Sequence, residues 1–252
     1  MNYKSFNFSI NKKSFKTPTW FSEYWKPDDE SRKYWEWQYQ LAKDGKEYKL
    51  PEETMRSPKS KLHQLMAKEF FNEILKNYNN FDSILDIGCS DGYMVKHFCQ
   101  NGKKATGIEN LIYPTDRLFI EENNLLIKEM DMHSLDFPDE SFDAVWCRHA
   151  LEHSFSPLQV LAECNRVLKK NGYFFCAIPP VPQPSEPYHG HFHQIPDYQL
   201  KYLQEMSNFE IIDLKNVNFS YKTKNDNAEI RSICRKKPIS KMSIRQKLMR
   251  MF

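Results

Sequence analysis

The chain has 252 residues, a formal net charge of +3 and an aromatic content of 14%. This length suits one α/β domain of ordinary size with ~80 residues to spare, and the near-neutral charge does not by itself indicate nucleic-acid binding. No stretch of sequence approaches the ~20 apolar residues that a bilayer-spanning helix needs.

Cysteine and charge are unevenly distributed. The six cysteines include no Cys-x-x-Cys pair, and most fall in apolar runs without a secretory h-region, so we expect a cytoplasmic protein. Residues 235–252 hold seven Lys/Arg and no acid, which leaves the rest of the chain at −4 (+3 less 7). We predict a basic tail over 236–252, which is either a solvated end or a weak contact for a membrane surface or polyanion.

Residues 1–58 form an aromatic-rich N-terminal extension. Its helix is predicted over Ser31–Lys43, with Ser31 as N-cap and Gly45 just past the end. Nine aromatic residues fall between positions 20 and 50: Trp20, Phe21, Tyr24, Trp25, Tyr34, Trp35, Trp37, Tyr39 and Tyr48. They either form a lid over a flat ligand or attach the extension to the core, and the sequence leaves both open.

A second helix is predicted over Lys59–Asn77, where apolar residues recur at helical spacing. Aromatic density and charge fall here, so we place a domain boundary near residue 58 and a second domain over 59–235.

The most informative stretch is Ser83–Gly92. A short apolar strand, Ser83–Ile87, leads through small residues at 88, 90 and 92 into a helical pattern over Tyr93–Asn101. The next strand, Lys104–Glu109, ends in an acid about 20 positions after the turn. A carboxylate at this place can accept hydrogen bonds from a ribose hydroxyl pair, which predicts a nucleotide-like ligand.

Two such ligands fit this geometry. A dinucleotide normally requires Gly-x-Gly-x-x-Gly, which is absent here, and Asp91 would repel its pyrophosphate. The pattern Asp86-x-Gly88-x-Ser90-x-Gly92 instead resembles motif I of class I S-adenosylmethionine-dependent methyltransferases, with Ser90 in place of the middle glycine. The resemblance implies an α/β fold: a Rossmann-like seven-stranded sheet with helices on both faces.

The resemblance extends over roughly residues 60–180. It includes a third strand, Leu125–Met130, a fourth over Ala144–Cys147, and a fifth over Tyr173–Ile178. "Leu-Glu-His" at 151–153 is a recurring signature of small-molecule relatives, and Lys169–Gly172 resembles the turn before the family's fifth strand. A helix over Tyr198–Met206 and a closing hairpin of Phe209–Phe219 and Ala228–Arg235 are expected to follow.

The family's site residues carry over onto this sequence. The resemblance implies that S-adenosyl-L-methionine binds, and S-adenosyl-L-homocysteine leaves, at Asp86, Gly88, Ser90, Glu109, Asp131, Met132 and Arg148. Asp131 is expected to meet the adenine, although an Asp after a strand also caps turns.

Histidines supply the candidate catalytic residues, namely His149, His191 and His193, whereas His153 is expected to hold local structure. Alternating His189, His191 and His193 are compatible with metal ligation, a substrate-facing base or ordinary loop positions, and we assign no metal. Methyl transfer itself needs alignment of the reacting atoms and, for a hydroxyl acceptor, a base.

The sequence therefore predicts a methyltransferase of the "methyltransferase domain 11"-like group. Its expected acceptor is a small molecule or a sugar or glycan precursor, with no specific nucleic acid as partner. The alternatives are an RNA or protein methyltransferase and a non-catalytic cofactor-binding subunit; a strong salt dependence of RNA binding would favour the first.

Overall fold

The computed structural model describes residues 17–19, 28–46, 58–181, 191–218 and 228–238. Four helices and three strands form the first half of this part: α2 (Asp29–Lys43), α3 (Pro58–Asn77), β1 (Ser83–Ile87), α4 (Tyr93–Gln100), β2 (Lys104–Glu109), α5 (Pro114–Glu122) and β3 (Ile127–Glu129). The second half comprises β4 (Phe142–Arg148), the 3-10 turn η1 (Leu151–His153), α6 (Pro157–Val167), β5 (Leu168–Ile178), α7 (Asp197–Met206), β6 (Phe209–Asn218) and β7 (Ala228–Lys236).

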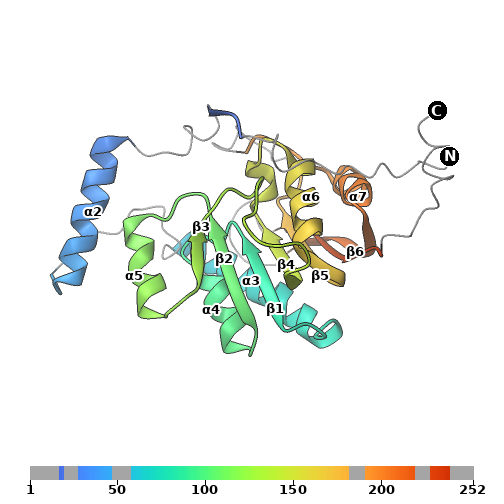
Figure 1. Ribbon diagram of the computed structural model, residues 1–252, viewed down its shortest axis with the longest axis horizontal. Coiled ribbons are helices and arrows are strands. Elements are labelled where there is room, and N and C mark those ends of the chain that lie inside the picture. Colours follow the sequence, from blue (N-terminus) through green and yellow to red (C-terminus); the bar gives the residue numbers. More distant parts are fainter. Residues whose placement is uncertain (1–16, 20–27, 47–57, 182–190, 219–227, 239–252) are drawn as a thin grey trace.

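The strands form a seven-stranded sheet in the order β3-β2-β1-β4-β5-β7-β6 (Figure 1). Strands β1 to β5 pair in parallel, while β7 runs antiparallel to both β5 and β6. Strand order reverses between β1 and β4, and ligands of open α/β sheets bind at the carboxyl ends of the strands at such a reversal. The predicted Rossmann-like fold is confirmed.

Each face of the sheet is covered by helices, because alternate residues of a strand point to opposite faces. Ile84 of β1 belongs to a core with residues of α3 and α4, and Leu85 belongs to a core with residues of α6 and α7. Trp146 of β4 is the largest fully buried side chain, and its ring lies 5.1 Å from that of Phe70 and 5.5 Å from that of Phe98. Buried on both faces, the central strands form a rigid support for the loops at their ends.

Helix α2 stands beside α5 at the β3 edge of the molecule (Figure 1). Polar contacts join the two helices: Lys43 to Glu121 at 2.6 Å and Arg117 to Glu36 at 3.1 Å. The helix begins earlier than predicted, because Asp28 rather than Ser31 is the N-cap and accepts the Ser31 backbone N–H at 2.8 Å.

A second difference concerns residues 169–172, which were predicted to form a turn before the fifth strand. They lie inside β5, where Phe142 pairs with Leu168 but Ala144 pairs with Tyr173. The extra residues of β5 form a bulge, and Asn171 adopts a φ of +60° within it.

Among the described helices none is long and apolar enough to span a membrane. His189, most of the N-terminal aromatic residues and most of the basic tail lie outside the described residues. The proposed domain boundaries therefore stay predictions.

Candidate functional site

The turn that follows β1, residues 88–92, lies at the carboxyl ends of the central strands of the sheet. Gly88, Ser90 and Gly92 have φ values of +71°, +51° and +83°. A Cβ on Gly88 would lie 2.7 Å from the Ala150 Cβ, and one on Gly92 would lie 2.3 Å from the Ile127 Cδ1. Glycine is therefore required at both positions, for its conformation and for its lack of a side chain.

Asp91 closes the N-terminus of α4. The side chain is buried, and its carboxylate accepts the Tyr93 backbone N–H at 3.0 Å. A dinucleotide pyrophosphate would need this same helix terminus, which Asp91 already occupies with negative charge. The local geometry thus disfavours a dinucleotide.

Glu109, at the end of β2, is held against this turn. Its Oε2 accepts the Ser90 backbone N–H at 2.8 Å, and its Oε1 accepts the Asn110 N–H at 2.9 Å. Burial raises the pKa of Glu109, and the two backbone hydrogen bonds oppose that rise. Each oxygen keeps a second lone pair, so the carboxylate can still accept hydrogen bonds from a ligand's vicinal hydroxyls.

These residues line a cavity of about 300 Å³ at the carboxyl edge, a volume at the lower end of the range for small-molecule sites. Of the predicted site residues, the lining includes Gly88, Ser90, Glu109, Asp131, Met132 and His149. It also includes residues that the sequence analysis did not select: Ile108, Asn110, Leu111, Tyr113, Asp116, Met130, Ala150 and His153.

Asp86 and Arg148, two further predicted cofactor residues, are not in that lining. Asp86 lies beneath the turn and is only 3% exposed; burial and then the charge of Glu109 raise its pKa, against the effect of Arg148. Arg148 instead pairs with Glu229 of β7. The Glu229 Oε1 lies 2.8 Å from the Arg148 Nε and 2.5 Å from the Arg148 Nη2. The sequence analysis did not select Glu229 as a site residue, because the pattern around it predicts only a strand.

His149 lies between this ion pair and the cavity. Its φ is +50°, and its Nε2 lies 3.0 Å from the Glu229 Oε1. Burial and the Arg148 charge lower the pKa of His149 to about 4, so the ring is neutral at pH 7. A neutral imidazole can accept a proton, which is compatible with the predicted catalytic role.

His191 and His193 contact residues of η1 and do not line the cavity. The His193 backbone N–H donates to the Glu152 carbonyl at 3.1 Å, and the His191 ring lies 4.5 Å from that of His153. His153, expected to be structural, lines the cavity.

Asp131 follows β3 and faces the cavity from the other side. Its Oδ1 lies 2.6 Å from the Nδ1 of His133, and its Oδ2 accepts a hydrogen bond from the Thr17 hydroxyl. Burial would raise the pKa of Asp131, but these hydrogen bonds lower it below its ordinary value. His133 is fully buried and stacks on Phe155, so it fixes the Asp131 loop to the core.

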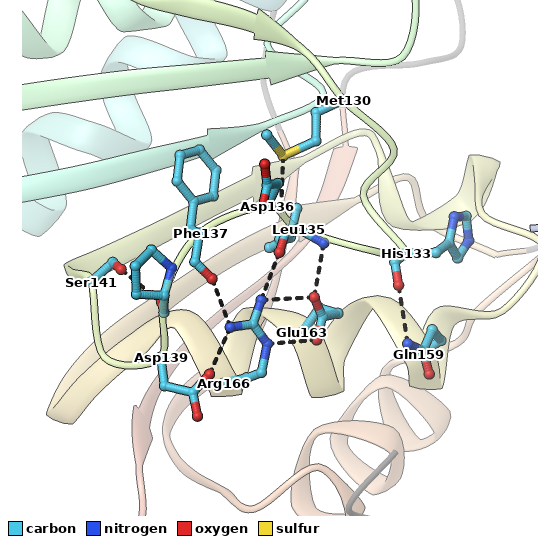
Figure 2. A network of polar contacts seen from close by, with 11 residues as sticks. Met130, His133, Leu135, Asp136, Phe137, Asp139, Ser141, Gln159, Glu163 and Arg166 are labelled. Atoms are coloured by element: carbon cyan, nitrogen blue, oxygen red, sulfur yellow. Dashed lines mark hydrogen bonds and ion pairs between the residues drawn. The ribbon is translucent and has the colours of Figure 1, made fainter. Parts of the chain in front are cut away.

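The loop that carries Asp131 and Met132 is anchored to α6 by Arg166 (Figure 2). The guanidinium donates to the carbonyls of Leu135 and Phe137, both at 2.8 Å, and to the carboxylates of Glu163 and Asp139. Glu163 in turn accepts the Leu135 N–H at 2.8 Å. Arg166 and Glu163 together therefore hold three backbone groups of the loop.

Replacing Arg166 with methionine is expected to destabilise the protein by about 2–4 kcal/mol, because it leaves two carbonyls and the buried Glu163 without their donor. Urea unfolding measures this loss, and hydrogen exchange over 131–141 should accelerate. The control is Arg117→Met, which removes an exposed ion pair to Glu36 and should cost less than about 1 kcal/mol. Equal losses in the two variants would contradict the anchoring role.

Comparison with known proteins agrees with this geometry. Residues 85–176 match the family described as "Methyltransferase domain". Ubiquinone biosynthesis O-methyltransferase of Histophilus somni (strain 2336) is 31% identical over 101 residues, which cover 36% of this chain and 42% of that protein. The match thus spans less than half the length of this curated relative.

Solved structures share the fold at lower identity. The 1,6-didemethyltoxoflavin-N1-methyltransferase of Burkholderia thailandensis, with bound 1,6-didemethyltoxoflavin and S-adenosylhomocysteine, has a TM-score of 0.60 at 14% identity and covers 89% of this chain and 94% of its own. The Haloferax volcanii methyltransferase in complex with the Trm112 methyltransferase activator has a TM-score of 0.59 at 15% identity, covering 80% and 98%.

The sheet order and the cavity at its reversal define an α/β protein built to hold a nucleotide-like ligand. More particularly, residues 85–176 form a methyltransferase domain of the class I S-adenosylmethionine-dependent type, as the motif at residues 86–92 suggested. S-adenosylmethionine is the cofactor of this class.

Proposed function

We propose that this protein transfers the methyl group of S-adenosylmethionine to a hydroxyl group of a small-molecule acceptor. The observation that carries this proposal is the cavity at the strand-order reversal, which is lined by both Glu109, held by the Ser90 backbone, and Asp131. Glu109 would hold the ribose and the Asp131–Met132 segment the adenine. The O-methyltransferase relatives support an oxygen acceptor.

The reaction is a displacement in which the acceptor oxygen attacks the methyl carbon while the carbon–sulfur bond breaks. The hydroxyl proton must leave, and the products are a methyl ether and S-adenosylhomocysteine. Alignment supplies much of the rate, since the sulfonium is already reactive. His149, neutral at pH 7 and lining the cavity, is our candidate to accept the proton.

Incubation with methyl-labelled S-adenosylmethionine and fractionated small-molecule pools, hydroxylated aromatic compounds and sugars included, tests this function. Label should pass to a small molecule with release of S-adenosylhomocysteine. Transfer only to RNA or protein would overturn the acceptor class. Cofactor binding without transfer to any pool would favour a non-catalytic subunit.

We propose that the N-terminal extension covers the cavity and encloses the bound acceptor. The Thr17 hydroxyl contacts Asp131, and α2 packs on α5, whose N-terminal region supplies Tyr113 and Asp116 to the cavity. A sugar or glycan precursor would suit such aromatic surroundings.

Deleting residues 1–50 is therefore expected to raise the acceptor KM roughly tenfold or more, the equivalent of about 1.4 kcal/mol. Circular dichroism would verify that the shortened chain is folded. An unchanged KM and rate would show that the extension only packs on the core.

We also propose a cytoplasmic location. All six cysteines are free thiols, and five of them are buried, which suits a reducing compartment.

A further inference from the structure

The carboxyl group of Glu152 is buried. Glu152 lies in η1 with 1% of its surface exposed, and neither carboxylate oxygen accepts a hydrogen bond from another residue that the structure describes. The Nδ1 of His149 lies 3.6 Å from Oε1, beyond hydrogen-bonding distance. A buried carboxylate is costly unless it is paired, protonated or bound to a metal.

Two histidines meet this carboxyl group. His153 is the next residue in η1, and His191 comes from the segment before α7; one ligand atom from each lies within 4.8 Å of the others and of a Glu152 oxygen. The hydrogen bond from the His193 N–H to the Glu152 carbonyl fixes this segment against η1.

We propose that Glu152, His153 and His191 bind one divalent transition-metal ion beside the methyl-transfer cavity. Two imidazole nitrogens and one carboxylate oxygen suit Zn²⁺, Fe²⁺, Mn²⁺ or Co²⁺ better than Mg²⁺ or Ca²⁺, which prefer all-oxygen sites. Metal–ligand bonds of about 2.0–2.2 Å place tetrahedral donors about 3.3–3.6 Å apart, so ligand atoms at the 4.8 Å bound would have to close by about 1 Å or slightly more.

The grouping differs from the pattern that the sequence suggested. Alternating His189, His191 and His193 gave no carboxylate partner, and the sequence analysis therefore assigned no metal. In the structure the two histidines make different contacts. The His191 ring lies near Glu152 and His153, whereas the His193 backbone N–H donates to the Glu152 carbonyl.

The site also has a chemical use, which rests on the proposed function. Three protein ligands leave coordination positions open for another group, as in catalytic zinc sites. His153 lines the cavity, so an acceptor hydroxyl could bind the metal there. A metal lowers the pKa of a bound hydroxyl group and orients it, and the hydroxyl proton would pass to His149 or to solvent.

Titration with Co²⁺ tests the site directly, because the visible absorption of Co²⁺ reports its nitrogen and oxygen ligands. We expect one Co²⁺ per chain in the wild type. Glu152→Gln and His191→Asn should each weaken binding at least about tenfold. The control His97→Gln removes a partly buried imidazole from α4, away from the cavity, and should leave Co²⁺ binding unchanged. Binding that neither site variant weakens, or no binding above the level of Glu152→Gln, would overturn the proposal.

Calorimetry with S-adenosylhomocysteine on the same proteins separates this inference from the proposed function. The site variants should still bind the cofactor product, which also shows that they are folded. Cofactor binding without Co²⁺ binding would overturn the metal site and leave the methyltransferase proposal intact. Co²⁺ binding without S-adenosylhomocysteine binding would support the metal site and overturn the proposed function.

Discussion

Glu109→Ala is expected to weaken S-adenosylhomocysteine binding by about 1–3 kcal/mol, which corresponds to roughly 5- to 150-fold in Kd. The substitution removes both oxygens that would accept the ribose hydroxyl hydrogen bonds. It also removes the acceptor that holds the Ser90 N–H at 2.8 Å, so the turn beneath the cofactor loses a support. Isothermal titration calorimetry measures the change.

Glu129→Ala is the matched control for this experiment. Glu129 pairs with Glu109 across β2 and β3, but it is exposed and does not line the cavity. Its removal has the same effect on net charge and should leave Kd within about twofold. If Glu109→Ala binds as tightly as Glu129→Ala, Glu109 does not hold the ribose and the assigned cofactor pose is wrong.

The sequence was most informative where local pattern and tertiary structure agree. The bounds of β1 and β2 match the prediction because each strand lies between clear turn residues. The α2 N-cap was misplaced because Asp28, Asp29 and Ser31 are all suitable cap residues within four positions. The bulge at residues 169–172 was missed because its pairing with β4 is a tertiary property.

The candidate site shows the same division. Gly88, Ser90, Glu109 and Asp131 could be selected because the turn and the strand ends mark them in sequence, and the structure places all four around one cavity. Glu229 and the contact between His191 and Glu152 could not be selected. They depend on how β7 and the segment before α7 return to the sheet, which no local spacing encodes.

Glu229 is a buried carboxylate that forms ion pairs with two arginines. It is fully buried between two arginines, with Arg148 at 2.5 Å from Oε1 and Arg231 at 2.8 Å from Oε2. Arg231 also donates to the Met66 carbonyl at 2.9 Å, which ties α3 to the same network. Two buried cations thus share one carboxylate, and His149 is oriented by that carboxylate as well.

Glu229→Gln should therefore destabilise the protein by about 3–5 kcal/mol, because it removes the counter-charge of the buried Arg148 guanidinium and leaves Arg231 with the more distant Glu73, at 3.9 Å. Urea unfolding at pH 7 measures this change. Glu210→Gln, an exposed substitution on β6 of the same sheet, should stay within about 0.5 kcal/mol of the wild type. A loss below about 1 kcal/mol in Glu229→Gln would show that the arginines find other partners.

The pH dependence gives this prediction a second test. Burial alone would raise the pKa of Glu229, but Arg148, His149 and Arg231 hold it well below its ordinary value. A carboxyl group with a depressed folded-state pKa stabilises the protein above its unfolded-state pKa of about 4.3, and this contribution is lost as the pH falls below that value. The difference in unfolding free energy between wild type and Glu229→Gln should thus be constant from about pH 6 to 8 and shrink below about pH 4. A difference that instead grows on acidification would contradict an ionised Glu229.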